Sequence, residues 1–213
     1  MTTRLLFLFD LDGTLIDSRR DLARATNRMR QRHDLEPLSL DVVVSYVGDG
    51  IGKLASRAVA GTGVDPEAAR REVEAEYAAH LWDETRPYPG VEEGFRTLKT
   101  AGHTLGLVTN KPAPHTRRLF DHFGWTDLFA VRMAGGDTPE LKPSPLPVLE
   151  AMNRTGFPPE QTWMVGDHHT DLEAARRAGI RSIFLQSGLG HTGQETPTRT
   201  CANFAEFVSL FTV

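Results

Sequence analysis

Three short apolar segments, each followed at once by polar residues, constrain the fold of this 213-residue chain more than any other feature. They are residues 4–9 (RLLFLF) before Asp10, residues 104–108 (TLGLV) before Thr109 and Asn110, and residues 162–165 (TWMV) before Gly166 and Asp167. Each has the length of a β-strand, and an unbroken apolar run is typical of a strand covered on both faces. The sequence therefore predicts a buried sheet whose strands end in polar side chains.

Helical patterns separate the apolar segments, and most of them end at a glycine. They cover residues 91–101, 112–123, 145–155 and 171–178, and a further short strand is expected over residues 182–185. Ser144 and Pro145 are typical of the N-cap and first position of a helix, so Ser144 is expected to cap the third one. The alternation of strands and helices predicts an α/β fold, with a parallel sheet and helices on both faces.

One long region interrupts this alternation because it contains only helical patterns. Within it, Ser18 followed by Asp21 is typical of a capping box, and Asp65-Pro66 opens a second helix. We therefore expect an all-helical domain inserted into a discontinuous α/β core. The expected boundaries are residues 17–86 for the helical domain, and residues 1–16 with 87–213 for the core.

Composition excludes several classes of protein. The formal charge of −4 argues against a nucleic-acid-binding protein, which would normally carry a basic face. The single cysteine, Cys201, rules out an intrachain disulfide and a cysteine-rich zinc site. The apolar run at the start, residues 5–9, is too short for a signal-peptide core or a membrane span. We expect a cytoplasmic monomer or homodimer with no membrane or nucleic-acid partner.

The end of the first strand carries the most informative residues, Asp10 to Thr14 (DLDGT). The site of a parallel sheet lies at the carboxyl ends of its strands, so Asp10 and Asp12 are expected to face the other polar strand ends. Gly13 permits a tight backbone turn there. Carboxylates that leave room for water and phosphate suit Mg²⁺. The pattern therefore predicts a magnesium site at this edge of the sheet.

Four segments resemble, in order, the signature motifs of the haloacid dehalogenase superfamily, most of whose members hydrolyse phosphate esters. The segments are Phe9–Leu15 (FDLDGTL), Val108–Lys111 (VTNK), Lys142–Pro145 (KPSP) and Gly166–Asp171 (GDHHTD). The resemblance covers nearly the whole chain. It implies a Rossmann-like core, an inserted helical cap and a Mg²⁺-dependent phosphatase that acts on a small phosphorylated metabolite.

The resemblance also implies roles for individual residues. Asp10 is the expected nucleophile, which takes the phosphoryl group as a covalent aspartyl-phosphate. Asp12 is the expected general acid and base, because it would protonate the leaving alcohol and then deprotonate the attacking water. Lys142 is expected to neutralise developing charge and to restrain Asp10.

The remaining motif residues are expected to bind the metal and the phosphate. The implied magnesium ligands are the carboxylates of Asp10 and Asp167 and the backbone carbonyl of Asp12, with Asp171 in support. The hydroxyl of Thr109 and the backbone N–H of Asn110 are expected to hold phosphate oxygens.

A glycine-rich segment of the helical insertion, residues 48–53 (GDGIGK), does not match a nucleotide-binding loop. The G-x-G-x-x-G pattern requires glycine where Lys53 stands, and the P-loop requires a hydroxyl residue after Gly-Lys. Residues 46–50 (YVGDG) resemble cap loops of phosphoglycolate phosphatases, so Gly50 and Lys53 are expected to face a 2-phosphoglycolate substrate. Two arginines are weaker candidates for contact with the substrate: Arg20 and Arg57.

Related activities with the same motifs stay open. They are a sugar-phosphate mutase, a pyrophosphatase and a phosphonate hydrolase; the last needs a cap lysine for a Schiff base, and Lys53 is the only one there. A hydrolytic dehalogenase is disfavoured by the presence of Asp12 and of the magnesium carboxylates. A non-catalytic phosphate-binding module is disfavoured because competent residues fill every catalytic position.

The fourth motif contains two adjacent histidines, His168 and His169, beside two aspartates. Such a group suggests a transition-metal site, but neighbouring side chains diverge and the other ligands are hard oxygens. We therefore expect the histidines to lie at the surface or around the carboxylates and not on the metal.

Overall fold

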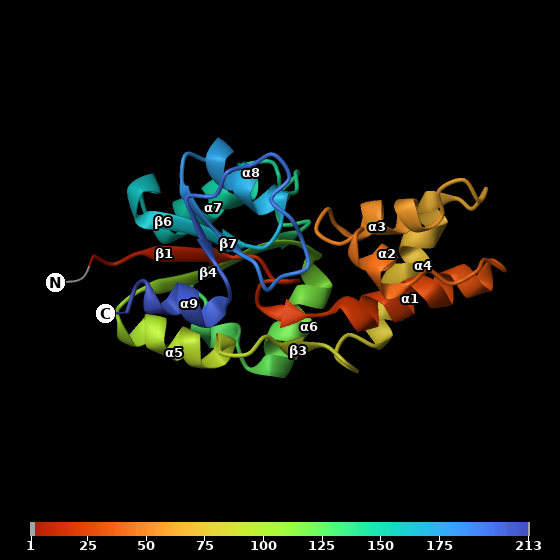
Figure 1. Ribbon diagram of the computed structural model, residues 1–213, viewed down its shortest axis with the longest axis horizontal. Coiled ribbons are helices and arrows are strands. Elements are labelled where there is room, and N and C mark those ends of the chain that lie inside the picture. Colours follow the sequence, from red (N-terminus) through yellow and green to blue (C-terminus); the bar gives the residue numbers. More distant parts are fainter. Residues whose placement is uncertain (1–2, 213) are drawn as a thin grey trace.

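A six-stranded parallel sheet lies at the centre of the computed structural model, which describes residues 3–212 (Figure 1). The strands lie in the order β5-β4-β1-β6-β7-β8, and each neighbouring pair is parallel. Their bounds are β1 Leu6–Phe9, β4 Thr104–Pro112, β5 Val131–Gly135, β6 Thr162–Gly166, β7 Arg181–Leu185 and β8 Arg199–Cys201. The predicted α/β fold is confirmed, and β1, the strand before Asp10, lies inside the sheet.

Helices cover both faces of the sheet. On one face lie α7 (Leu146–Thr155) and α8 (His169–Arg177); on the other lie α5 (Val91–Thr100), α6 (Ala113–Phe123) and α9 (Phe204–Ser209) (Figure 1). Two 3-10 helices, Thr126–Leu128 and Pro159–Gln161, precede β5 and β6. Both faces of the sheet are therefore buried, which explains the unbroken apolar runs in its central strands, Leu6–Phe9 of β1, residues 105–108 of β4 and residues 163–165 of β6.

Strand β1 shows how the sequence anchors the site. Successive side chains of a strand point to opposite faces, so Leu6 and Leu8 join one apolar cluster whereas Phe7 and Phe9 join the other. The ring of Phe9 packs against Phe95 of α5, with ring centroids 6.1 Å apart. Because all four β1 side chains are fully buried, the strand holds the residue that follows it on a rigid element.

The helical region between β1 and α5 packs as a group beside one end of the sheet (Figure 1). Its helices are α1 Arg19–Arg32, α2 Leu40–Val44, α3 Ile51–Ala58 and α4 Pro66–Ala79, and α4 packs on both α1 and α3. Two short strands join this region to the sheet as an antiparallel ribbon, β2 (Ile16–Asp17) and β3 (Arg86–Pro87). Within residues 3–212, no helix is both long and apolar enough to cross a membrane.

The predicted capping box at the start of α1 is wrong. Ser18 is the N-cap residue, but its hydroxyl donates to the Asp12 carboxylate instead of accepting from the helix. Asp21 is fully buried, and its carboxylate accepts hydrogen bonds from the N–H groups of Glu84 and Thr85. Both side chains therefore bind groups outside the helix, Ser18 six residues earlier in the chain and Asp21 63 and 64 residues later, which a capping rule does not anticipate.

The cap of α7 also differs from the prediction. The helix begins at Leu146 with Pro145 as its N-cap residue, one position later than expected. The Ser144 hydroxyl still accepts a hydrogen bond from the Leu146 N–H at 3.3 Å, so the polar group is used although the cap position is shifted. In contrast, Asp65 caps α4 as expected by accepting from the Ala68 N–H at 2.9 Å.

Candidate active site

Three carboxylates meet at the carboxyl ends of β1 and β6. Asp10 follows β1, Asp167 follows β6, and Asp171 lies in the first turn of α8; all three are buried. Each offers an oxygen within 4.8 Å of the oxygens offered by the other two. Side chains separated by more than 150 residues in the sequence therefore form one compact anionic cluster.

Hydrogen bonds to both of its oxygens hold the Asp167 carboxylate in place. The Thr14 hydroxyl donates to one oxygen at 2.7 Å, and the N–H groups of Leu189 and Gly190 donate to the other at 2.8 and 3.0 Å. Gly13 lies directly against this carboxylate with a φ of +89°, and a Cβ atom added there would meet an Asp167 oxygen at 2.2 Å. Glycine at position 13 is therefore required both by the backbone conformation and by the close approach.

Lys142 supplies the positive charge at the centre of the cluster. Its ammonium group donates to Asp10 at 2.9 Å, to Asp171 at 2.6 Å and to the Val108 carbonyl at 2.6 Å. The side chain is buried, and its pKa is raised: burial lowers it, but the attraction of Asp10 and Asp171 outweighs that effect. Lys142 thus contacts two of the three carboxylates, and its single charge leaves the buried cluster with an excess of negative charge.

Burial and the excess of negative charge raise the pKa values of Asp10 and Asp167. Burial raises the pKa of Asp10 from 3.8 to about 6, although Lys142 acts to lower it. Burial, with repulsion from Asp10 and Asp171, raises the pKa of Asp167 to about 7. A hard divalent cation relieves both effects, since carboxylate oxygens are the ligands that Mg²⁺ takes in proteins. The donor set and its charge therefore fit Mg²⁺.

Asp12 lies beside this cluster and is held by a residue that the sequence analysis did not single out. Lys111 donates to both Asp12 oxygens, at 2.8 and 2.9 Å, and to the Tyr77 hydroxyl of α4 at 2.7 Å. Lys111 is buried; burial lowers its pKa, but the Asp12 carboxylate more than compensates and raises it. The only signal for this role was a lysine directly after the polar strand end, at the last residue of the second motif.

Thr109 and Asn110 are buried and lie within β4, which continues to Pro112 past the strand end predicted at Val108, with an irregular pairing to β5 after Val108. The Asn110 side-chain amide donates to the carbonyls of Gly48 and Lys142, each at 2.9 Å, and accepts from the Lys142 N–H at 2.8 Å. It therefore joins the loop before α3 to the loop that carries Lys142. This clamp was not predicted, because only the backbone N–H of Asn110 was assigned a role.

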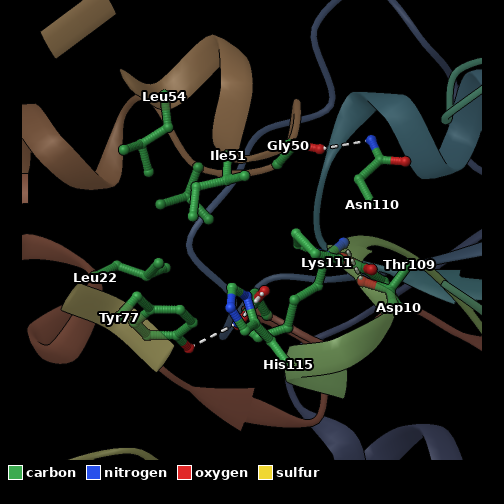
Figure 2. A pocket seen from close by; sticks show the side chains of 14 residues that line it. Asp10, Leu22, Gly50, Ile51, Leu54, Tyr77, Thr109, Asn110, Lys111 and His115 are labelled. Atoms are coloured by element: carbon green, nitrogen blue, oxygen red, sulfur yellow. Dashed lines mark hydrogen bonds and ion pairs between the residues drawn. The ribbon is translucent and has the colours of Figure 1, made fainter. Parts of the chain in front are cut away.

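A pocket with about 460 Å³ of empty space, part of it open to solvent, lies between the helical region and the sheet. In Figure 2, Asp10 and Thr109 lie on one side of the pocket, and Leu22, Ile51 and Leu54 lie across from them. Its polar lining residues are Asp10, Asp12, Tyr77, Thr109, Asn110, Lys111 and His115. The pocket therefore places Asp10, Asp12 and Thr109 opposite apolar side chains of the helical region.

His115 is a neutral group in this lining. Its ring lies edge-on to Tyr77 with centroids 5.5 Å apart, and its buried Nδ1 atom has no hydrogen-bond partner among residues 3–212. Burial, reinforced by the charges of Lys111 and Arg118, lowers its pKa to about 4. Lys111 is therefore the cation among the residues that line the pocket.

The residues expected to contact substrate from the helical region are found in different places. Gly50 lines the pocket, whereas Lys53 is exposed on α3 and is not among the lining residues. Arg57 pairs with Asp49 at 2.5 Å, and Arg20 pairs with Glu84 at 3.0 Å. The structure thus brings together Asp10, Asp12, Gly50, Thr109, Asn110, Lys142, Asp167 and Asp171, and leaves Lys53 outside.

His168 and His169 follow Asp167 directly, at the start of α8. His168 is buried and caps α8, and burial together with the charge of His169 lowers its pKa to about 4. His169 is partly exposed. His168 therefore stands as a neutral imidazole at the rim of the carboxylate cluster.

Comparison with known proteins agrees with this site. The model of the haloacid dehalogenase-like hydrolase family matches residues 7–185. The chain belongs to this family. The match spans the strands that carry Asp10, Thr109 and Asp167, so the resemblance inferred from the four motifs is confirmed.

Individual relatives are similar over most of their length. The phosphoglycolate phosphatase of Neisseria meningitidis is 39% identical over 194 residues, which cover 85% of this chain and 80% of the relative. That of Chromobacterium violaceum is 37% identical over 208 residues, which cover 95% and 94%. The crystal structure of a "predicted phosphoglycolate phosphatase" from Haemophilus somnus superposes with a TM-score of 0.92 at 32% identity and covers 99% of both chains.

Proposed function

We propose that this hydrolase is a Mg²⁺-dependent phosphatase that cleaves a small phosphate monoester through an aspartyl-phosphate on Asp10. One observation carries the proposal: Asp10 belongs to the carboxylate cluster, accepts a hydrogen bond from Lys142 and lines the pocket. The same side chain is therefore suited to act as the nucleophile and as a metal ligand, and it borders the space for the substrate. The names of the relatives support phosphate esters as the substrate class.

The proposed reaction has two displacement steps. In the first, an Asp10 oxygen attacks phosphorus, the bond from phosphorus to the ester oxygen breaks, and Asp12 gives its proton to the leaving alcohol. In the second, Asp12 takes a proton from water, the water oxygen attacks phosphorus, and the acyl-phosphate bond breaks to free Asp10 and inorganic phosphate. Each step replaces one phosphorus–oxygen bond by another, so covalent catalysis divides a very slow hydrolysis into two easier reactions.

The magnesium ion would be held by Asp10, Asp167 and Asp171, with the backbone carbonyl of Asp12 as a further ligand. When bound, it offsets the repulsion between the anionic nucleophile and the anionic phosphate. Lys142 keeps the Asp10 carboxylate oriented and supplies a fixed positive charge at the same place. Thr109 lies beside Asp10 in the pocket lining and is suited to donate its hydroxyl to a phosphate oxygen.

Asp12 needs a change of partner before it can act as an acid. As long as both its oxygens accept from Lys111, neither oxygen is free to give a proton to the leaving alcohol. A second anionic group on the substrate would compete for Lys111 and release Asp12. 2-Phosphoglycolate carries such a carboxylate next to its phosphate ester, and it is the substrate we propose.

We further propose that residues 17–86 act as a cap over a core formed by residues 1–16 and 87–213. The pocket lies between the helical region and the strand ends, and the two connections pair as the short β2–β3 ribbon. Rotation about this ribbon would open the pocket to substrate and close it against water. Lys53, on the exposed side of α3, would reach the substrate only in another cap position, so its role stays a prediction.

The test is phosphate release from a panel of monoesters headed by 2-phosphoglycolate, with and without Mg²⁺. Turnover is expected only with Mg²⁺, and it should vanish in Asp10→Asn while the exposed Asp127→Asn control keeps it. Activity without a preference for 2-phosphoglycolate would retain the chemistry and reject the substrate. Conversion of a sugar phosphate without release of phosphate would instead support a mutase.

A further inference from the structure

We propose that Asp49, His168 and His169, with His191 beside them, form a binding site for a divalent transition-metal cation of the Zn²⁺ type. The site lies next to the carboxylate cluster but uses none of its side chains. Asp49, His168 and His169 each offer a ligand atom within 4.8 Å of the other two. The proposal concerns binding, so it does not depend on the proposed phosphatase activity.

The spacing of the ring nitrogens suits a metal. The Nδ1 atoms of His168 and His169 are 3.1 Å apart. Two ligands of a tetrahedral centre with metal–nitrogen bonds of about 2.0–2.1 Å lie about 3.3 Å from each other. The ring of His191 lies 5.3 Å, between centroids, from each of the other two rings. Two imidazoles and one carboxylate therefore already lie within reach of one ion; on binding, the His168 Nδ1 atom would exchange its hydrogen bond from the Thr170 N–H for the metal, and the His191 ring lies beside the group.

Three separate segments of the chain supply these groups. Asp49 belongs to the loop before α3, the adjacent pair His168–His169 follows β6, and His191 belongs to the loop after β7. Gly48 and Gly190 allow the loops to approach, since a Cβ atom on either would lie 2.8 or 2.6 Å from the His168 ring. A metal here would thus tie the helical region to the core.

The chemistry of the donors favours Zn²⁺ over Mg²⁺. Imidazole nitrogens suit zinc, cobalt and nickel, whereas Mg²⁺ takes oxygen ligands. Arg57 binds one Asp49 oxygen at 2.5 Å, which holds that carboxylate in place and leaves its second oxygen for a cation. The site and the neighbouring carboxylates would therefore select different metals, and the transition metal would hold the loop before α3 against the core.

The experiment measures metal binding with the carboxylate cluster already filled. Metal-free full-length protein is saturated with Mg²⁺, and Zn²⁺ is then titrated by calorimetry and Co²⁺ by visible absorption. Two variants remove ligands, His169→Gln and Asp49→Asn, and neither side chain is fully buried. The matched control is His122→Gln, which replaces an exposed histidine on α6 that is not part of the ligand group.

We expect one Zn²⁺ per chain in the wild type and in His122→Gln, with binding weaker by at least about 10-fold in both ligand variants. The Co²⁺ absorption bands of imidazole coordination should weaken in the same two variants. Unchanged Zn²⁺ affinity in both, or complete displacement of Zn²⁺ by excess Mg²⁺, would place the ion on the carboxylates and overturn the proposal. Absence of any Zn²⁺ binding would overturn it as well.

Discussion

Replacing Asp10 by asparagine should abolish turnover and, in the absence of metal, stabilise the fold. The pKa of the buried Asp10 carboxyl is raised from 3.8 to about 6, mainly by burial. Each pH unit of this rise corresponds to about 1.36 kcal/mol, so ionising Asp10 in the folded protein costs about 3 kcal/mol. Asparagine has the shape of the protonated acid and avoids this cost, while its carbonyl can still accept from Lys142.

The expected gain depends on pH in a definite direction. Because the folded state binds the Asp10 proton more tightly than the unfolded chain does, the contribution of Asp10 to wild-type stability falls as pH rises from about 4 through about 6. Asp10→Asn should therefore match the wild type near pH 4 and exceed it by up to about 3 kcal/mol at pH 8. For a chain of this length, that difference corresponds to a rise in Tm of roughly 6–12 °C.

The assay is thermal unfolding in EDTA at pH 4, 6 and 8, repeated with saturating Mg²⁺. Mg²⁺ should stabilise the wild type by about 2.7 kcal/mol at 100 times its Kd and thereby close most of the gap. The exposed Asp127→Asn should stay within about 0.5 kcal/mol of the wild type throughout. An Asp10→Asn gain that is equal at pH 4 and pH 8, or no gain at pH 8, would refute the argument from buried charge.

Three further results are expected. Lys111→Met should lower kcat/KM for 2-phosphoglycolate at least about 10-fold more than for p-nitrophenyl phosphate, because the second substrate has no carboxylate to pair with the lysine; equal losses would reject that contact. Gly13→Ala should lower the free energy of unfolding by roughly 1–3 kcal/mol through backbone strain, and it should also weaken activation by Mg²⁺ because the new Cβ meets Asp167. The control Gly61→Ala, at φ +73° with open space around it, should show only the loss from strain. EDTA should stop turnover and lower Tm, and added Mg²⁺ should restore both; turnover that persists in EDTA would contradict a metal requirement.

Much of the fold could be predicted because buried parallel strands have a strong sequence signal. The apolar runs that became β1, β4 and β6 contain no charged residue before their polar ends, apart from the first residue of the first run. Strands β5 and β8 were missed because they lack this signal: β5 contains Arg132 at its second position, and β8 has three residues. Their place in the sheet is set by neighbours, which a single sequence does not show.

The candidate site likewise contains residues that could be placed from the sequence and residues that could not. Asp10 and Asp167 could be placed because each follows a strand, and the carboxyl ends of parallel strands share one edge. Lys111 could not, because its partners lie 99 residues away in Asp12 and 34 residues away in Tyr77. The contact of Ser18 was missed for another reason: a serine just before a helix is typical of an N-cap, whereas this hydroxyl donates to Asp12, six residues earlier in the chain.

The groups proposed to carry out the chemistry are also those that oppose folding. Asp10 and Asp167 have raised pKa values because burial leaves their charge incompletely compensated by Lys142. Apolar residues in these positions would give a more stable core, but they could neither bind a divalent cation nor attack phosphorus. A metal ion that binds only the folded protein offsets the cost, since its binding free energy adds to the free energy of unfolding. Neutralising one carboxylate of the cluster should therefore raise the stability of the metal-free protein and lower its affinity for Mg²⁺, and a variant that gained stability without losing Mg²⁺ affinity would show that the carboxylates are not the metal site.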